Sequence, residues 1–222
     1  VYNAEKYISL SLEIIKLQSY KNFRCIIIDD CSTDNTINKI KNVISDDDRF
    51  ELLINNKNLG SSLGNMIKGF DYLNPDDEEI IVRLDGDDWL SSVFVLEYLN
   101  QVYNVYKCWV TYGTYQIYPS GLTGDHQCVE IPDFVHKNNS YRENPHIYSH
   151  LRTHKAFLLK KIDRKYFMYP DSNNYFKESE DVAHMMPLVE MAGKDKIFRV
   201  NDYLVVLNRD GDNHVADNRL KK

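Results

Sequence analysis

The first 90 residues alternate between short apolar runs and longer segments in which apolar positions recur every three or four residues. The short runs are rich in Ile, Leu and Val and are bounded by polar residues, which is typical of buried strands. They occupy residues 23–28, 50–54 and 80–84. Helical spacing is found over residues 8–15, 37–44 and 61–73. Because Val1 to Ala4 reads as the end of another strand, the predicted order is β-α-β-α-β-α-β, which gives a parallel sheet with helices on both faces.

The remainder of the chain has a less regular pattern. The predicted elements are a helix over 91–103, a strand over 109–118, a helix from Glu178 to a stop at Gly193, and short strands over 196–200 and 203–208. Residues 126–145 are polar and aromatic and fit neither period. They are either a variable acceptor loop or an ordinary surface excursion.

Polar side chains crowd the carboxyl ends of the predicted strands. They are Asn3, Asp29, Asp30, Asn58 and Asp85 to Asp88. Since parallel strands place their carboxyl ends on one edge of a sheet, we expect these side chains to meet in one crevice, where such sheets bind ligands.

Three carboxylates, those of Asp85, Asp87 and Asp88, follow the apolar run at 80–84. Hard oxygen ligands suit Mg²⁺ or Mn²⁺, which bind through one or two carboxylates and otherwise through substrate phosphates. The implied ligand is a metal-bound diphosphate. The alternative is a solvated turn in which Asp88 caps the next helix. An EF-hand is excluded, because the sixth position from Asp85 is Leu90 where a glycine is required.

Length and charge narrow the class of protein. At 222 residues the chain is long enough for one large α/β domain. Its net charge of −6 argues against broad nucleic-acid binding. No apolar run approaches the length of about 18 residues that a membrane span needs. We therefore expect a cytoplasmic protein, with any membrane association made by parts outside this segment.

Four sequence blocks occur in order at suitable spacings. They read Val-Tyr-Asn-Ala-Glu-Lys-Tyr-Ile, then Ile-Ile-Asp-Asp-Cys-Ser-Thr-Asp-Asn-Thr, then Asn-Leu-Gly with Asn65 beyond it, and finally Leu-Asp-Gly-Asp-Asp. Together they resemble the nucleotide-binding half of the family 2 glycosyltransferases, which have the GT-A fold. The resemblance is strong over residues 1–90 and loose beyond them. It implies a Rossmann-like α/β fold with a mostly parallel central sheet flanked by helices and a smaller C-terminal acceptor-side region.

The same resemblance implies a domain organisation. Residues 1–222 would form one GT-A domain, with a nucleotide-sugar-binding half at 1–90 and an acceptor-side half at 91–222. The first strand of the fold would precede Val1 and would be truncated in this chain.

The resemblance assigns the nucleobase site to the first two loops. Tyr2 and Asn3 would border the base, and Asp30, with Asp29 close behind, would hydrogen-bond to it. The alternative for the aspartates of this loop is helix capping and an Asx turn, and both roles are compatible.

The diphosphate and metal site would lie at the Asp-x-Asp block. Asp85 would contact the ribose, and Asp85 and Asp87 would hold Mn²⁺ or Mg²⁺ on the diphosphate. The resemblance also implies donor-binding roles for Asn58, Arg152, Glu180 and Arg209, and a third metal ligand at His214. His214 follows Arg209 at a longer spacing than is usual in the family.

Two further clusters carry candidate chemistry. Glu180 and Asp181 open a predicted helix, where acidic residues ordinarily reflect the helix dipole. They also resemble the family's Glu-Asp motif, in which the aspartate is the catalytic base, and we predict that role for Asp181. His146, His150 and His154 have a spacing that on a helix would suit zinc, but no Glu completes a zincin pattern.

The resulting hypothesis is a metal-dependent inverting glycosyltransferase. It would move a sugar from a nucleotide-diphosphate donor, most simply a UDP-sugar, to a hydroxyl of a glycan, a lipid-linked molecule or a protein. The alternatives are a metal-dependent nucleotidyltransferase and a non-catalytic domain that binds a sugar nucleotide or glycan.

Overall fold

The computed structural model of this chain describes residues 1–124 and 128–210. The helices are α1 (Ile8–Lys16), α2 (Thr36–Ile44), α3 (Ser62–Leu73), α4 (Val95–Tyr106), α5 (Asp133–Asn138), α6 (Ala156–Lys160) and α7 (Glu180–Ala192). The strands are β1 (Cys25–Asp29), β2 (Phe50–Ile54), β3 (Ile80–Arg83), β4 (Trp89–Leu90), β5 (Val110–Tyr118), β6 (Arg152–Lys155) and β7 (Ile197–Asn208). Short 3₁₀ turns are η2 (Tyr141–Glu143), η3 (Arg164–Phe167) and η4 (Lys194–Lys196).

The strands form two sheets. β1 and β2 pair in parallel, and the other strands form a five-stranded sheet in the order β3-β6-β5-β7-β4. In this larger sheet β6 is antiparallel to β3 and β5, β4 is antiparallel to β7, and β5 runs parallel to β7. The prediction of a mostly parallel central sheet is therefore wrong, and the central sheet is mixed. The prediction assumed that consecutive strands joined by a helix run parallel, which holds for β1 and β2. After β5, a long connecting segment instead lets β6 return antiparallel between β3 and β5.

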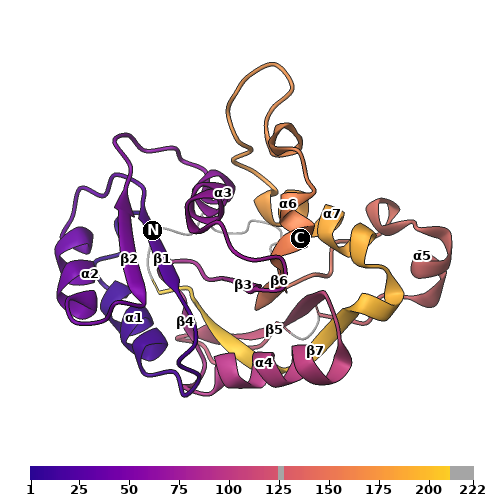
Figure 1. Cartoon of the computed structure of the whole chain (residues 1–222), viewed down its shortest axis with the longest axis horizontal. Helices are drawn as coiled ribbons and strands as arrows, with labels where there is room; N and C mark the ends of the chain where they lie inside the picture. Colours follow the sequence, from indigo (N-terminus) through magenta and orange to yellow (C-terminus); the bar gives the residue numbers. More distant parts are fainter. Residues whose placement is uncertain (125–127, 211–222) are drawn as a thin grey trace.

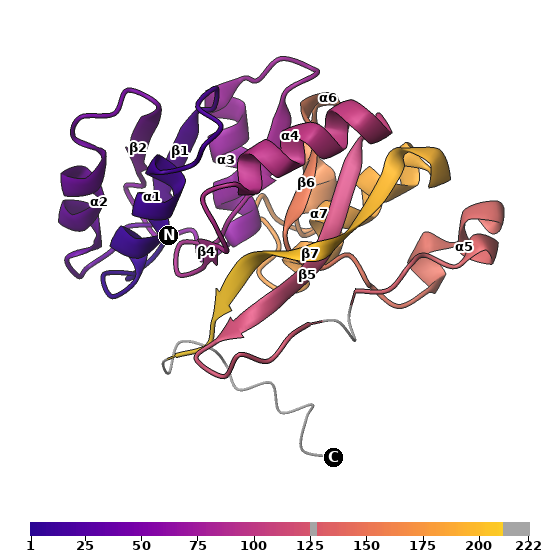
Figure 2. The ribbon, with the colours of Figure 1, turned by 90° about the horizontal axis from the view of Figure 1, so that it is seen from below.

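Helices cover both faces of the larger sheet (Figures 1 and 2). α3, α6 and α7 share a core with β5, which includes Leu63, Leu158 and Leu188. α4 packs on the opposite face, where Leu99 and Val205 belong to a second core. α1 and α2 bury a third core against β1 and β2. Within the described ranges, no helix is both long and apolar enough to cross a membrane.

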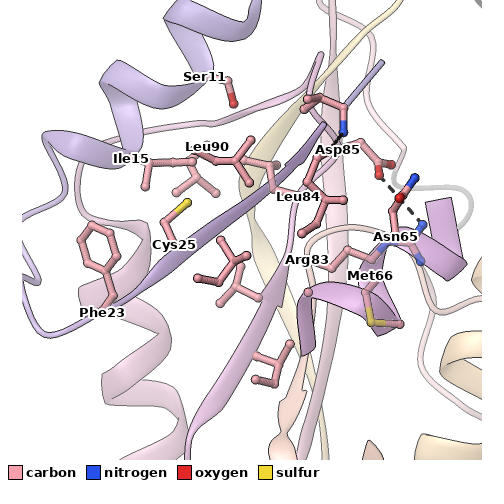
Figure 3. Close-up of a pocket in the computed structure, with 18 of the residues that line it drawn as sticks. Ser11, Ile15, Phe23, Cys25, Asn65, Met66, Arg83, Leu84, Asp85 and Leu90 are labelled. Atoms are coloured by element: carbon pink, nitrogen blue, oxygen red, sulfur yellow. Dashed lines mark hydrogen bonds and ion pairs between the residues drawn. The ribbon is translucent and has the colours of Figure 1, made fainter. Parts of the chain in front are cut away.

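An apolar slot separates β1 from β3 (Figure 3). It forms part of a cavity of about 1840 Å³ whose lining includes Ile15, Cys25 and Leu84. At one end of the slot the amino group of Val1 donates to the Ile28 carbonyl (2.6 Å), and the Asp30 amide donates to the Val1 carbonyl (2.8 Å). This is the hydrogen-bond pattern of a parallel strand pair. Val1 thus pairs in parallel with the end of β1, and the strand predicted to precede it stays a prediction.

Most elements of the first 90 residues form where the apolar pattern predicts them, and β2 has the predicted bounds. The two strands predicted at the end of the chain are one strand, β7. Its pairing with β5 shifts between Arg199 and Tyr203, so the extra residues form an irregularity within a continuous strand. Exposed Asn201 and Asp202 lie at this shift, which explains the break in the apolar pattern.

Two histidines are buried together between β6 and α7. His154 is 1% exposed and His184 is fully buried, and their Nε2 atoms lie 3.3 Å apart. His154 Nδ1 lies 3.0 Å from the Lys155 carbonyl, which assigns a proton to that nitrogen and leaves Nε2 to accept from His184. Burial lowers the pKa of His154 to about 4. Burial, together with the adjacent His154, lowers the pKa of His184 well below its usual value.

This pair is expected to make the fold acid-labile. Because both pKa values are lower in the folded state, the unfolded chain binds more protons below pH 6.5, and stability falls as the pH decreases from that value. Each histidine should remove about 1 kcal/mol of unfolding free energy per pH unit between pH 6.5 and 5. Urea denaturation at a series of pH values measures this slope. The double variant His154→Gln/His184→Gln should flatten it, whereas His136→Gln on α5 should change it less. An unchanged slope in the double variant would show that other groups control acid stability.

Candidate active site

The structure brings together most of the polar residues that the sequence places at strand ends. Tyr2, Asn3, Asp30 and Asn58 line the same large cavity as Asp85 and Asp87. Asp29 and Asp88 are instead buried and do not line this cavity. The cavity wall seen in Figure 3 includes Asn65 on α3 and Arg83 and Asp85 at the end of β3.

The Asp30 carboxylate is held by the loop after β2. It accepts hydrogen bonds from the Leu59 amide (2.8 Å), the Gly60 amide (3.0 Å) and the Asn55 side chain (2.7 Å). Burial alone would raise its pKa, but these hydrogen bonds outweigh burial and hold the pKa below its usual value. The ionised Asp30 carboxylate therefore holds the loop after β2 in place by hydrogen bonds, and this loop carries Asn58, which lines the cavity.

The Asp29 side chain supports the structural alternative for this block. Its Oδ1 accepts from the Ser32 amide (2.9 Å), which is the hydrogen bond of a capped turn. Its Oδ2 is buried and has no hydrogen-bond partner among the described residues.

The first loop is locked to the turn after β1. Asn3 has a φ of 46°, in the left-handed region that asparagine tolerates. Its amide donates to Ser32 Oγ (3.0 Å), and its Oδ1 accepts from the Thr33 amide (2.8 Å). Tyr2, which is 50% exposed, is thereby held at the mouth of the cavity.

The Asp-x-Asp turn concentrates negative charge. Asp88 points away from the cavity and accepts from the Asn208 amide of β7 (2.8 Å). Burial raises the pKa of Asp88 to about 8, and the carboxylates of Asp85 and Asp87 act in the same direction. A cation beside Asp85 and Asp87 would relieve this repulsion, so the turn suits a divalent ion.

The residues fit a cation shared with a substrate better than a preformed protein cage. Among the described residues, no group of three His, Cys, Asp or Glu side chains is arranged to hold a metal ion. Two carboxylates completed by substrate phosphates are sufficient for Mg²⁺. The predicted third ligand, His214, lies outside the described residues.

Asp181 faces two arginines at the edge of this turn. Arg152 binds it with both Nη atoms, each 2.7 Å from one carboxylate oxygen. Arg83 Nη2 lies 3.8 Å from Asp181 Oδ1 and 3.9 Å from Asp85 Oδ1. Arg152 is 4% exposed, whereas the side chain of Asp181 is 42% exposed. The predicted base is thus accessible and is positioned by a buried guanidinium.

The arginines also act on Asp85. Burial would raise the pKa of Asp85, but the positive charge of Arg83, reinforced by that of Arg152, lowers this pKa below its usual value. Arg83 was not predicted as a site residue, although a charged side chain that ends an apolar strand is a signal for one.

His146 and His150 lie in the loop before β6, and His154 lies on β6, so the three histidines do not share a helix face.

Glu180 has a structural partner. Its carboxylate accepts from the Ser62 amide (3.2 Å) and the Leu63 amide (2.6 Å) at the start of α3, where Ser61 also caps the Gly64 amide. This contact joins the first turns of α3 and α7 and accounts for Glu180 without a donor. Its predicted donor-binding role stays a prediction.

Removal of this cap should destabilise the protein. Glu180→Ala leaves two amides at the start of α3 without acceptors and is expected to cost about 1–2 kcal/mol in unfolding free energy. Glu180→Gln keeps an acceptor oxygen and should cost less. Urea denaturation measures both. Wild-type stability in Glu180→Ala, together with weaker nucleotide binding, would favour the donor-binding role.

Arg209 follows β7 beside Asp181. Its amide donates to the Tyr118 carbonyl (2.8 Å), and the residue lines a second, smaller cavity together with Arg152 and Asp181. The structure therefore places Arg209 and Arg152 near the predicted base.

Comparison with known proteins agrees with this geometry. The family model described as Glycosyl transferase family 2 matches residues 1–167. An uncharacterized glycosyltransferase of Haemophilus influenzae is 36% identical over 100 residues, which are 45% of this chain and 38% of that protein.

Solved structures show the same fold. S. aureus TarS 1–349 in complex with UDP-GlcNAc has a TM-score of 0.67 at 16% identity, over 96% of this chain and 58% of that chain. The mannosyltransferase PcManGT from Pyrobaculum calidifontis, in complex with GDP-Man and Mn²⁺, has a TM-score of 0.61 at 16% identity, over 93% of this chain and 54% of that chain. This chain thus spans less than two thirds of each of these relatives.

These matches confirm the resemblance drawn from the four sequence blocks, and the structural neighbours confirm the GT-A glycosyltransferase fold. The family match covers more than half of the sequence. The chain therefore belongs to glycosyl transferase family 2.

Proposed function

We propose that the protein transfers a sugar from a nucleotide-diphosphate donor to a hydroxyl acceptor with inversion, and that Asp181 is the general base. One observation carries this proposal. The guanidinium of Arg83 lies within 4 Å of both Asp85 and Asp181, so the turn suited to a diphosphate and the exposed candidate base are neighbours.

The proposed reaction needs two groups on opposite sides of the anomeric carbon. Asp181 accepts the proton of the acceptor hydroxyl as its oxygen bonds to that carbon. The bond from the carbon to the diphosphate oxygen breaks, and its electron pair leaves with the nucleotide. A divalent cation bound by Asp85 and Asp87 would supply charge stabilisation for the leaving diphosphate.

The donor is proposed to be a UDP-sugar. TarS was solved with UDP-GlcNAc, and PcManGT, which has a lower TM-score, was solved with GDP-Man. The fold alone therefore does not determine which nucleobase the donor carries. Titration calorimetry with UDP, GDP and dTDP, each with and without Mn²⁺, tests the proposal. We expect UDP to bind and Mn²⁺ to strengthen that binding. Failure of every nucleotide to bind a folded protein would contradict the proposed donor site.

A further inference from the structure

Arg83 lies between the Asp-x-Asp turn and the proposed base without a hydrogen bond to either. Its Nη2 atom is 3.9 Å from Asp85 Oδ1 and 3.8 Å from Asp181 Oδ1. Both distances exceed the range of about 2.7–3.2 Å for an N–H···O hydrogen bond. The guanidinium is held instead by Ser62 Oγ at the start of α3. The Arg83 side chain is 8% exposed and lines the large cavity beside Asp85 (Figure 3).

The positive charge of Arg83 has no hydrogen-bonded counter-ion among the described residues. Its Nη1 atom is buried and has no hydrogen-bond partner within the same residues, although a guanidinium carries five N–H donors. Asp181 is not that counter-ion, because Arg152 already binds its two oxygens at 2.7 Å each. The contact of Arg152 shows what a structural ion pair looks like in this fold, and Arg83 departs from it. A charge left in this state favours an anion that completes its hydrogen bonds.

The same charge disfavours a free cation at the turn. A divalent ion on Asp85 and Asp87 would lie close to a like charge, since Arg83 Nη2 is 3.9 Å from one of the predicted ligand atoms. Repulsion between like charges is strong where water is partly excluded. Asp181 adds little attraction for the ion, because Arg152 neutralises it. The protein by itself is therefore a weak site for the cation.

A diphosphate reverses this balance. Its oxygens can bind the cation and also accept hydrogen bonds from the planar guanidinium, and arginine favours two-point contacts with phosphate. We propose that Arg83 makes the metal turn selective for a divalent cation that arrives with a diphosphate, because it repels the free cation and binds a phosphate oxygen of the donor. This inference rests on the proposed function and adds a donor-binding residue to it.

The alternative is that Arg83 only joins β3 to α3 through Ser62. In that case loss of the side chain would weaken the binding of the cation and the nucleotide together, or of neither. The proposal instead requires changes of opposite sign for the two ligands. A general loss of structure cannot produce opposite signs.

Binding measurements on Arg83→Gln test the proposal. Mn²⁺ alone is titrated into the protein without nucleotide, with the free ion followed by electron paramagnetic resonance, and UDP is titrated by calorimetry at saturating Mn²⁺. We expect Mn²⁺ alone to bind about tenfold more tightly than to the wild type, because a like charge is removed. UDP should bind about tenfold more weakly, because a charge-assisted hydrogen bond is lost. Unchanged or weaker binding of Mn²⁺, or unchanged binding of UDP, would overturn the inference.

Arg83→Lys separates charge from hydrogen-bond geometry. It keeps the repulsion, so Mn²⁺ alone should bind as weakly as to the wild type, whereas UDP should lose affinity because lysine lacks the planar fork. If thermal unfolding shows that Arg83→Gln does not fold, this variant decides the question, and wild-type affinity for UDP in it would contradict the proposal.

A matched control removes an arginine that lines neither cavity. Arg142→Gln breaks an exposed ion pair with Glu190 on α7 and should change neither affinity. Failure of the wild-type protein to bind any nucleotide with Mn²⁺ would refute the proposed donor site. Wild-type binding of UDP, together with Arg83 variants that behave like Arg142→Gln, would refute this inference alone.

Discussion

Asp181→Asn is expected to retain nucleotide binding and to lose sugar transfer. The amide cannot accept the proton of the attacking hydroxyl, and general-base catalysis typically contributes about 10²–10⁴-fold in rate. Donor affinity should change little, because Asp181 lies across Arg83 from the turn that is predicted to hold the diphosphate. Calorimetry with the nucleotide and a transfer assay with saturating donor measure the two effects separately.

The ion pair with Arg152 makes a stability control necessary. Arg152 is 4% exposed, so loss of its charged partner destabilises the region around β6. Thermal unfolding in the presence of nucleotide therefore accompanies the assay. Glu178→Gln is a matched control, since it removes one carboxylate from an exposed position just before α7. A loss of donor affinity in Asp181→Asn as large as its loss of transfer would contradict the assignment of a base.

Apolar periodicity predicted the local elements well but not the sheet to which they belong. The runs at 50–54 and 61–73 form β2 and α3 nearly as expected, because burial of one face determines both. The mixed sheet depends on which strands pair after residue 118, and β6, a short buried strand with Arg, Thr, His and Lys, has no apolar signature. A strand defined by its neighbours cannot be recognised from its own residues.

The candidate site shows the same division. Motif spacing predicted that Asn3, Asp30 and Asp85 meet in one cavity, because the carboxyl ends of strands share an edge. It did not predict that Glu180 caps α3 or that Arg152 pairs with Asp181, since both contacts join residues distant in sequence. Sequence could indicate where charges gather, whereas the partner of each charge followed only from tertiary packing.

Asp87→Asn is expected to abolish the Mn²⁺-dependent part of nucleotide binding. Asp87 lines the cavity beside Asp85, and loss of one of two carboxylates leaves too few hard ligands to share a cation with the diphosphate. Since disturbance of a metal's outer contacts alone costs about 10–100-fold in affinity, loss of a direct ligand should cost at least about tenfold. Calorimetry with UDP in the presence of Mn²⁺, and again with EDTA, measures this difference.

Asp88→Asn provides the sharpest control, because it makes the same replacement of a carboxylate by an amide in the adjacent side chain. Asp88 is 5% exposed and turned toward β7, and an asparagine carbonyl can still accept from the Asn208 amide. Its nucleotide affinity should therefore stay near the wild-type value, as should that of Asp48→Asn, an exposed position before β2. Equal losses in Asp87→Asn and Asp88→Asn would mean that the shape of the turn matters, and not a cation ligand at Asp87. Sensitivity to EDTA without sensitivity to Asp87→Asn would place the cation on other side chains.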